Sequence, residues 1–240
     1  MRVAEMNWMQ MEQQVARDDR CVFPLGSTEQ HAQLSLCVDA ILAERVAVEA
    51  AEPLEVPVYP AMPYGLAPYF AAYPGTVSLR VETLLAVARD VLVSMYRTGF
   101  RRILMVNGHG GNNPVGALAL ELMTEYPDLS VKLHNWWNAP QTLAKVQAID
   151  PLASHASWME NFPWTRLAHA PAPAGCKPQC DMTLLKASPP AEARALLGDG
   201  NFAGEYQKAD AVMAELWAVG VAETREALAG PWPELGNRQA

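Results

Sequence analysis

Hydrophobic and polar positions divide the chain into short apolar runs and longer helix-forming stretches. Residues 21–25 and 102–106 are apolar runs with the length and composition of buried strands, and residues 131–135 are predicted as a further strand. Helix-forming stretches follow the first two runs, at residues 40–51 and 114–126. Alternating strands and helices predict parallel strands joined by right-handed crossovers. We therefore expect an α/β fold, a three-layer α/β/α sandwich with a mainly parallel central sheet.

Further elements complete the predicted fold. A helix with an apolar face is expected to begin near residue 81, with Ser78 as its cap, and to end at Gly99. The prolines of residues 55–60 favour a strand at a sheet edge or end. Residues 62–75 form a long loop rich in aromatic residues, proline and glycine, which is either functional or a packed surface loop. The remaining predictions are helices at 9–17, 190–197 and 206–228, and a short strand at 182–187.

Candidate chemistry begins directly after the first apolar run. Glu29, His31 and Asp39 follow residues 21–25, and ligand sites of α/β sheets collect at the carboxyl ends of strands. Glu29 and His31 are two residues apart, so in an extended segment they project to one side. Glu, His and Asp suit zinc, manganese or a similar divalent ion. The alternative is a solvated glutamate, a capping aspartate and an incidental loop histidine.

Two further stretches carry the same residue types. Residues 107–113 read Asn-Gly-His-Gly-Gly-Asn-Asn and follow the second apolar run, and their glycines let the backbone approach a ligand closely. The helical sequence after them also offers free amide donors at a helix N-terminus. Here the alternative is a tight turn with an incidental His109. The third stretch places His155 and Glu160 five residues apart, which is a weak signal by itself.

Together these stretches resemble the creatininase (creatinine amidohydrolase) family. The shared patterns are a G-S-x-E-Q-H loop, an N-G-H-G-G-N turn, a P-G-T-x-S-L segment and a segment that begins with His-Ala, in the same order over residues 22–161. The resemblance implies the same sandwich fold and two bound divalent metal ions, with Zn²⁺ or Mn²⁺ favoured and Fe²⁺ a third candidate. It also implies that Asp39 bridges the two ions and that His155 is a catalytic acid/base. The implied metal ligands are Glu29, His31, Asp39, His109 and Glu160.

The implied reaction is hydrolysis of a carbon–nitrogen bond in a small-molecule amide, cyclic amides included, through a metal-activated water. Gly110, Gly111, Tyr69 and Trp137 are expected on the substrate side, the two glycines as backbone donors to the oxyanion. Gly111 stands where creatininase proper carries a glutamate, and the loop before Asp39 is one residue shorter than usual. We therefore expect a divergent member whose substrate is not creatinine.

Composition limits the partners and the compartment. The net charge of −8 argues against a nucleic-acid partner. No apolar run is long enough for a membrane span and the start lacks a signal peptide, so we expect a cytoplasmic protein of one domain over residues 1–240. Free thiols are expected at the four cysteines, with a second metal site at Cys176 and Cys180 as the alternative. The aromatic loop predicts a homo-oligomer, a hexamer by resemblance.

Two other functions remain open at this point. One is a metal-binding pseudoenzyme or scaffold, which the shortened loop and the changed pocket residues permit. The other is a nucleotide-binding α/β protein that uses the turn at residues 107–113. That turn lacks both the G-x-G-x-x-G order and the lysine of a P-loop, so we rank it last.

Overall fold

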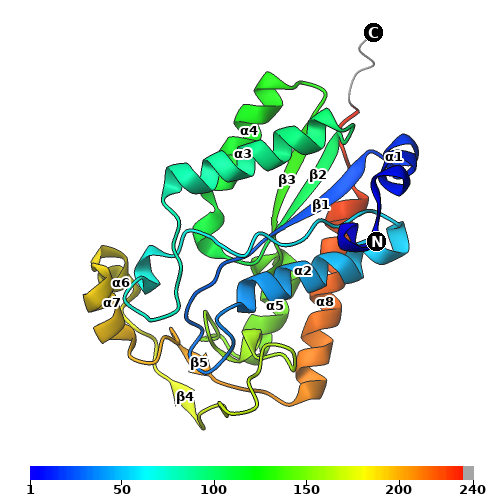
Figure 1. Cartoon of the computed structure of the whole chain (residues 1–240). Helices are drawn as coiled ribbons and strands as arrows, with labels where there is room; N and C mark the ends of the chain where they lie inside the picture. The colour runs from blue at the N-terminus through cyan, green and yellow to red at the C-terminus, as the bar shows by residue number, and fades with distance from the viewer. Residues whose placement is uncertain (235–240) are drawn as a thin grey trace.

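The structure is a computed structural model that describes residues 1–234. Its central sheet contains β1 (Arg20–Leu25), β2 (Arg102–Asn107) and β3 (Ser130–Asn135), which are parallel and adjacent in that order (Figure 1). Leu25 pairs with Asn107, which pairs with Asn135, so the three strands end at one level. The strands predicted at residues 21–25, 102–106 and 131–135 are therefore confirmed, and their carboxyl ends form one edge of the sheet.

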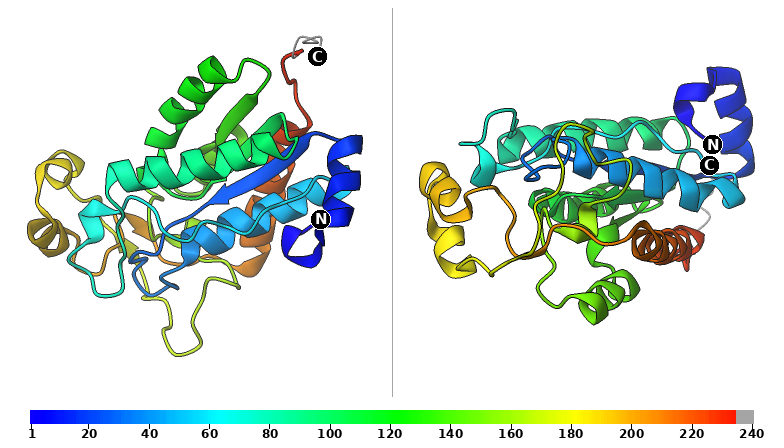
Figure 2. Two further views of the ribbon diagram at one scale, coloured as in Figure 1. Left: turned by 45° about the horizontal axis from the view of Figure 1, so that its top comes forward. Right: turned by 90° about the horizontal axis from the view of Figure 1, so that it is seen from below.

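The two faces of the sheet pack against different helices, as the period of two along a strand requires. Cys21, Phe23 and Leu25 of β1 lie in one core cluster, whereas Val22 lies in the other. The first cluster includes residues of α3 (Val81–Arg97) and α4 (Pro114–Glu125). The second includes residues of α2 (Val38–Ala51), α5 (Pro140–Ile149) and α8 (Asp210–Ala229), and α8 contacts both α2 and α5 (Figure 2). The predicted three-layer α/β/α arrangement is confirmed.

Outside the sandwich lie α1 (Trp8–Arg17), α6 (Met182–Ala187), α7 (Pro190–Leu197) and a two-stranded antiparallel sheet of β4 (Cys176–Lys177) and β5 (Gly204–Glu205). The strand predicted at residues 182–187 is wrong, because the segment is helix α6. Its cap is Asp181, whose carboxylate accepts hydrogen bonds from the amides of Thr183 and Leu184. Helix α5 was not predicted.

Two local predictions are also wrong: the strand at residues 55–60 and the helix cap at Ser78. Residues 55–60 form no regular strand, and only Val58 makes isolated bridges, to Arg2 and Val22. The prolines at positions 57 and 60 lack the amide donors that a longer ladder needs. Ser78 does not cap α3, whose N-cap is Arg80 without a side-chain bond. The Ser78 hydroxyl instead accepts a hydrogen bond from the amide of Ala67 in the long loop.

Helix α2 brings Asp39 to the sheet edge. Because α2 begins at Val38, Asp39 lies in its first turn and not on the loop where the sequence placed it. A Cβ on Gly108, just after β2, would lie 2.4 Å from the carbonyl oxygen of Asp39. Glycine is therefore required at this position for α2 to start against the end of β2. Within residues 1–234, no helix combines the length and the apolar character needed to cross a membrane.

Candidate active site

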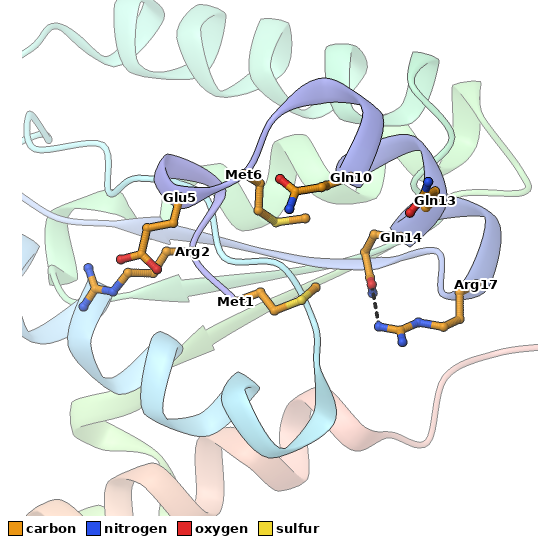
Figure 3. Close-up of a pocket in the computed structure, with 8 residues that line it drawn as sticks. All are labelled: Met1, Arg2, Glu5, Met6, Gln10, Gln13, Gln14 and Arg17. Carbon is orange, nitrogen blue, oxygen red and sulfur yellow. Dashed lines mark hydrogen bonds between the residues drawn. The ribbon is translucent and has the colours of Figure 1, made fainter.

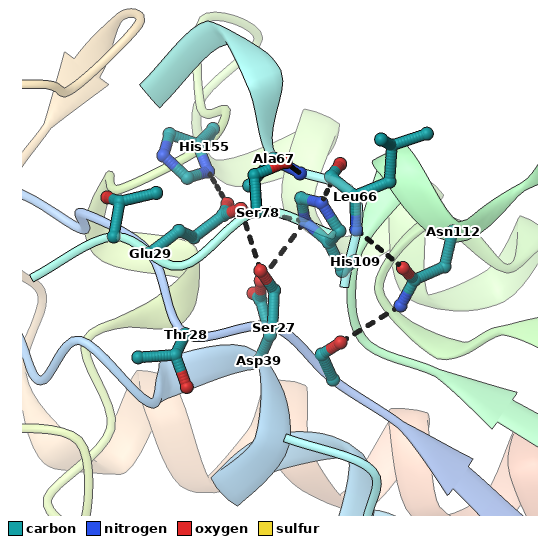
Figure 4. A network of polar contacts seen from close by, with 12 residues as sticks. Ser27, Thr28, Glu29, Asp39, Leu66, Ala67, Ser78, His109, Asn112 and His155 are labelled. Carbon is teal, nitrogen blue, oxygen red and sulfur yellow. Dashed lines mark hydrogen bonds and ion pairs between the residues drawn. The ribbon is translucent and has the colours of Figure 1, made fainter. Parts of the chain in front are cut away.

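Asp39 is the centre of a buried cluster of acids and histidines at the carboxyl end of the sheet (Figure 4). Its Oδ1 lies 3.1 Å from Nε2 of His31, and its Oδ2 lies 3.1 Å from Nδ1 of His109. Each carboxylate oxygen therefore faces a different histidine. This is the arrangement of a carboxylate shared between two neighbouring sites.

A second carboxylate completes each side of the cluster. Glu29 Oε2 lies 3.2 Å from Nδ1 of His109, and Glu160 Oε2 lies 3.7 Å from Nε2 of His31. The ligand-type atoms of Glu29, Asp39 and His109 lie within 4.8 Å of one another, as do those of His31, Asp39 and Glu160. The structure thus brings together the five residues that the sequence singled out as metal ligands, in two groups that share Asp39.

Backbone and side-chain hydrogen bonds fix the orientation of these groups. His31 Nδ1 lies 3.2 Å from the carbonyl oxygen of Glu29, and His109 Nε2 lies 2.8 Å from that of Leu66. In the neutral ring, a proton on the nitrogen beside the carbonyl leaves the nitrogen that faces Asp39 free to bind a metal ion. Ser27 donates a hydrogen bond to Glu29, and the amide of Ala156 donates one to Glu160.

Electrostatics at the cluster favour positive charge. Burial alone would lower the pKa of His31, but the carboxylates of Asp39 and Glu160 raise it to about 10. The pKa of His109 is likewise raised well above its usual value, because Glu29 and Asp39 outweigh the effect of burial. Burial raises the pKa of Glu160 to about 7. Burial would also raise the pKa of Asp39, but the charge of His31 and hydrogen bonds from both histidines lower it.

The unsatisfied atoms of the cluster fit a divalent cation. Glu29 Oε1, His31 Nε2 and Asp39 Oδ2 are buried and have no hydrogen-bond partner of good geometry within residues 1–234. Buried polar atoms without partners are rare, and they are typical of sites that bind a ligand or an ion. Carboxylate and imidazole donors in groups of three match the chemistry of zinc and manganese sites.

His155 lies beside the cluster, and its ligand-type atom forms a third group with those of Glu29 and His31, again within 4.8 Å of one another. Its ring stacks on Phe70 at a centroid distance of 4.7 Å and contacts Phe202 at 4.8 Å. Nε2 of His155 faces Gln30, 2.9 Å from its side-chain nitrogen and 3.2 Å from its backbone carbonyl oxygen. Nδ1 faces the cluster and lies 3.8 Å from Oε1 of Glu29. Burial and the nearby His31 lower the pKa of His155 well below its usual value.

A cavity of about 390 Å³ opens onto this cluster. Tyr69, Gly110, Gly111 and Trp137, the four residues expected on the substrate side, all line it. A separate cavity of about 560 Å³ lies at the N-terminus and is lined by methionine, glutamine and arginine side chains (Figure 3). Among the described residues, the groups suited to a metal all belong to the first cavity's cluster.

Gly111 leaves no room for the glutamate that creatininase proper carries at this position. A Cβ there would lie 1.9 Å from the carbonyl oxygen of Leu66 and 2.5 Å from Nε2 of His109. The long loop at residues 62–75 therefore closes directly over this turn. Glu160 supplies the carboxylate that stands beside His31 and Asp39 instead.

The sequence and the fold were compared with those of known proteins. A family model described as "Creatininase: Creatinine amidohydrolase" matches residues 4–196, which is most of the chain. The chain belongs to the creatininase family. Its departures from the family motif make it a divergent member, and the identities to relatives are low.

Three characterised relatives show how far members of the creatininase family diverge. The chain is 29% identical over 163 residues to a creatinine amidohydrolase of Pseudomonas putida, covering 62% of each chain. It is 28% identical over 146 residues to a 3-dehydro-scyllo-inosose hydrolase of Thermotoga maritima, covering 59% of this chain and 47% of the relative. It is 36% identical over 110 residues to a mycofactocin precursor peptide peptidase of Mycolicibacterium smegmatis, covering 42% of this chain and 43% of the relative. The matches thus span less than two thirds of each relative.

Solved creatininase structures share the fold over nearly the whole chain. A structure titled "Creatininase Mn" superposes with a TM-score of 0.74 at 24% identity, covering 94% of this chain and 96% of that one. Another, titled "Crystal structure of creatinine amidohydrolase (creatininase)", gives a TM-score of 0.75 at 24% identity, covering 95% and 96%. At these identities the likeness shows the fold of the creatininase family.

Sequence reasoning missed several residues that support the site. Gln30 carried a signal, because it stands between Glu29 and His31 in the motif. Asn107 also stood in a quoted motif, and its side chain bonds both the amide and the carbonyl of His109. No sequence motif pointed to Phe202, because it is distant from His155 in the sequence and contacts it only in the folded structure.

Proposed function

We propose that this creatininase-family protein is a metal-dependent amidohydrolase that cleaves the carbon–nitrogen bond of a small amide, cyclic amides included. The observation that carries the proposal is the pair of ligand groups sharing Asp39 at the floor of a cavity. A buried cluster of three carboxylates and two histidines with unsatisfied atoms is costly unless cations complete it.

The metal assignment follows from the two groups. Glu29, Asp39 and His109 would hold one divalent ion, and His31, Asp39 and Glu160 the other. Bound metal ions lower the pKa of a coordinated water and polarise a carbonyl oxygen, which are the two requirements of amide hydrolysis. Zn²⁺ or Mn²⁺ is the proposed occupant, with Fe²⁺ the third candidate. The titles of solved creatininases name manganese and a Zn–Zn type, respectively.

His155 is the proposed proton carrier. Both contacts with Gln30 involve Nε2 of the ring, which leaves Nδ1 facing Glu29 and the cluster. Phe70 and Phe202 fix the ring plane and exclude water from its faces. A positioned neutral imidazole of this kind would take up the proton released from the attacking water and pass it to the leaving nitrogen, the role that general acid–base catalysis assigns to histidine.

The remaining cavity residues bind and orient the substrate. Gly110 and Gly111 place backbone amides at the floor, where they stabilise negative charge on the attacked oxygen. Tyr69 and Trp137 contribute aromatic surface to the wall. The printed activities of the relatives concern creatinine, an inosose and a precursor peptide, so none of these substrates is assigned to this chain.

An amide panel assayed on metal-loaded protein tests this function. The protein is stripped with chelator, reloaded separately with Zn²⁺ or Mn²⁺, and given linear amides, cyclic amides and ureas. Hydrolysis that requires metal and falls in the His155→Ala variant supports the proposal. Bound metal without hydrolysis of any member would instead identify a pseudoenzyme.

We further propose a homo-oligomer formed by a one-domain cytoplasmic chain. The loop at residues 62–75 keeps aromatic side chains exposed, with Tyr64 47% and Tyr69 37% accessible in the isolated chain. Aromatic side chains are enriched in protein interfaces. A mass several times that of the chain in light scattering would support this assembly, whereas a monomer at micromolar concentration would contradict it.

A further inference from the structure

The cavity over the cluster is lined by one basic side chain. Lys186 of α6 is the sole lysine or arginine among its lining residues within the described chain. Glu29, Asp39 and Glu160 line the same cavity, and α6 lies beyond the carboxyl ends of the strands (Figure 1). The lining therefore combines the acidic cluster at the strand ends with one basic residue from a helix outside the sandwich.

Lys186 also differs from the basic residues around it in having no partner. Lys177 pairs with Asp199, and Arg194 donates to the carbonyl of Ala72 at 2.9 Å. Lys208 pairs with Glu205. Lys186 makes neither a hydrogen bond nor an ion pair with any residue between 1 and 234. Its ammonium group is thus available to a ligand in the cavity.

A second donor in the same cavity has no partner either. Nε1 of Trp137 is buried and unsatisfied within the described residues, although the indole lines the cavity. An indole N–H can only donate, so the group that satisfies it must bring an acceptor. Leaving such a donor buried and unpaired is costly, and a bound ligand with an acceptor recovers that cost.

Apolar side chains also line the cavity. Phe70, Met159, Met182 and Phe202 are among them. Apolar walls of low dielectric strengthen the field of a single charge inside a cleft. A ligand that fits this lining has an apolar part and carries an anionic acceptor group in addition to the amide.

We propose that the substrate is an amide bearing a carboxylate, which Lys186 recognises while the amide lies over the Asp39 cluster. This inference rests on the proposed amidohydrolase function, and it adds the chemical class of the substrate. Lys186 is a specificity-determining residue: it selects the charged end of the substrate and takes no part in bond cleavage. An ammonium partner of this kind changes affinity by about three- to tenfold.

A matched pair of amides tests the inference. Glutaric acid mono-4-nitroanilide and its methyl ester differ in one negative charge and share the scissile amide. Their hydrolysis is followed by nitroaniline release, and their binding is measured by calorimetry on metal-loaded protein. The variants are Lys186→Met and Lys186→Glu, and the control is Lys145→Met, which removes a lysine paired with Glu215 outside the cavity.

The expected result is that the parent protein prefers the carboxylate over the ester by three- to tenfold in Kd. Lys186→Met should abolish this preference, Lys186→Glu should reverse it, and Lys145→Met should leave it unchanged. Equal binding of both amides, or a preference that survives in Lys186→Met, would overturn the inference. If binding depends on Lys186 but neither amide is hydrolysed, the anion site is supported and the amidohydrolase function is refuted. The failure of the inference and the failure of the proposed function therefore give different results.

Discussion

Asp39→Asn is the substitution that should affect both proposed metal ions at once. Asparagine keeps the shape of the side chain but has no charge, and its amide nitrogen cannot act as a ligand. Each oxygen of Asp39 lies 3.1 Å from a different histidine, so a ligand atom is lost on one side and the negative charge on both. Even residues that only support a ligand change metal affinity by 10–100-fold, so we expect at least about 100-fold at each site, or about 2.7 kcal/mol.

The assay is elemental analysis of protein dialysed against defined free metal, together with binding isotherms. The matched comparisons are His109→Gln and Glu160→Gln, because each residue belongs to one ligand group only. Each comparison variant should lose one ion, whereas Asp39→Asn should lose both. Circular dichroism checks that all three variants fold. If Asp39→Asn retains both ions at the parent affinity, the shared ligand is another residue, and the shorter loop before Asp39 has moved the ligand position.

Three further predictions concern the proton carrier, the glycine turn and a buried histidine. His155→Ala should keep its metal while the rate falls about a hundredfold or more, whereas Glu160→Ala should lose metal and rate together; metal analysis and the amidase assay on both variants decide this. Gly111→Ala should destabilise the protein by about 1–3 kcal/mol in urea unfolding, because its Cβ would overlap the carbonyl of Leu66; unchanged stability would contradict the close approach. Burial lowers the pKa of His134 to about 4, so protonation favours the unfolded chain and stability falls as pH drops from about 6.5 to 4. His134→Gln should remove about 2 to 3 kcal/mol of that loss, measured as the difference from the parent between pH 7.5 and 4, and parallel pH profiles would refute it.

The fold was largely predictable because its signals are local. The segments that form β1, β2 and β3 are short, and helix-forming stretches follow the first two, so the alternation of strand and helix predicted a parallel sheet. Residues 182–187 failed because a short apolar run fits a buried strand as well as a helix. The side chain of Asp181 caps the N-terminus of this helix. In the sequence, a capping residue before so short a run is only a weak indication of a helix.

The site was predictable where its residues share motifs, and unpredictable where tertiary contacts place them. Glu29, His31 and His109 stand next to strand ends, so strand pairing alone brings them together. The contact of Gln30 with His155 joins segments far apart in sequence and depends on the path of the chain through Gly200, whose carbonyl accepts from the same amide. Lys186 on α6 reaches the cavity only through packing outside the sandwich, which no local pattern encodes.

The central claim is that two divalent ions share Asp39, and anomalous diffraction from crystals of zinc-loaded protein tests it most directly. Difference maps collected at the zinc absorption edge should show two peaks, one among Glu29, Asp39 and His109 and the other among His31, Asp39 and Glu160. Each peak should lie within about 2.0–2.2 Å of its ligand atoms. A single peak, peaks away from Asp39 or no peak at all would contradict the account.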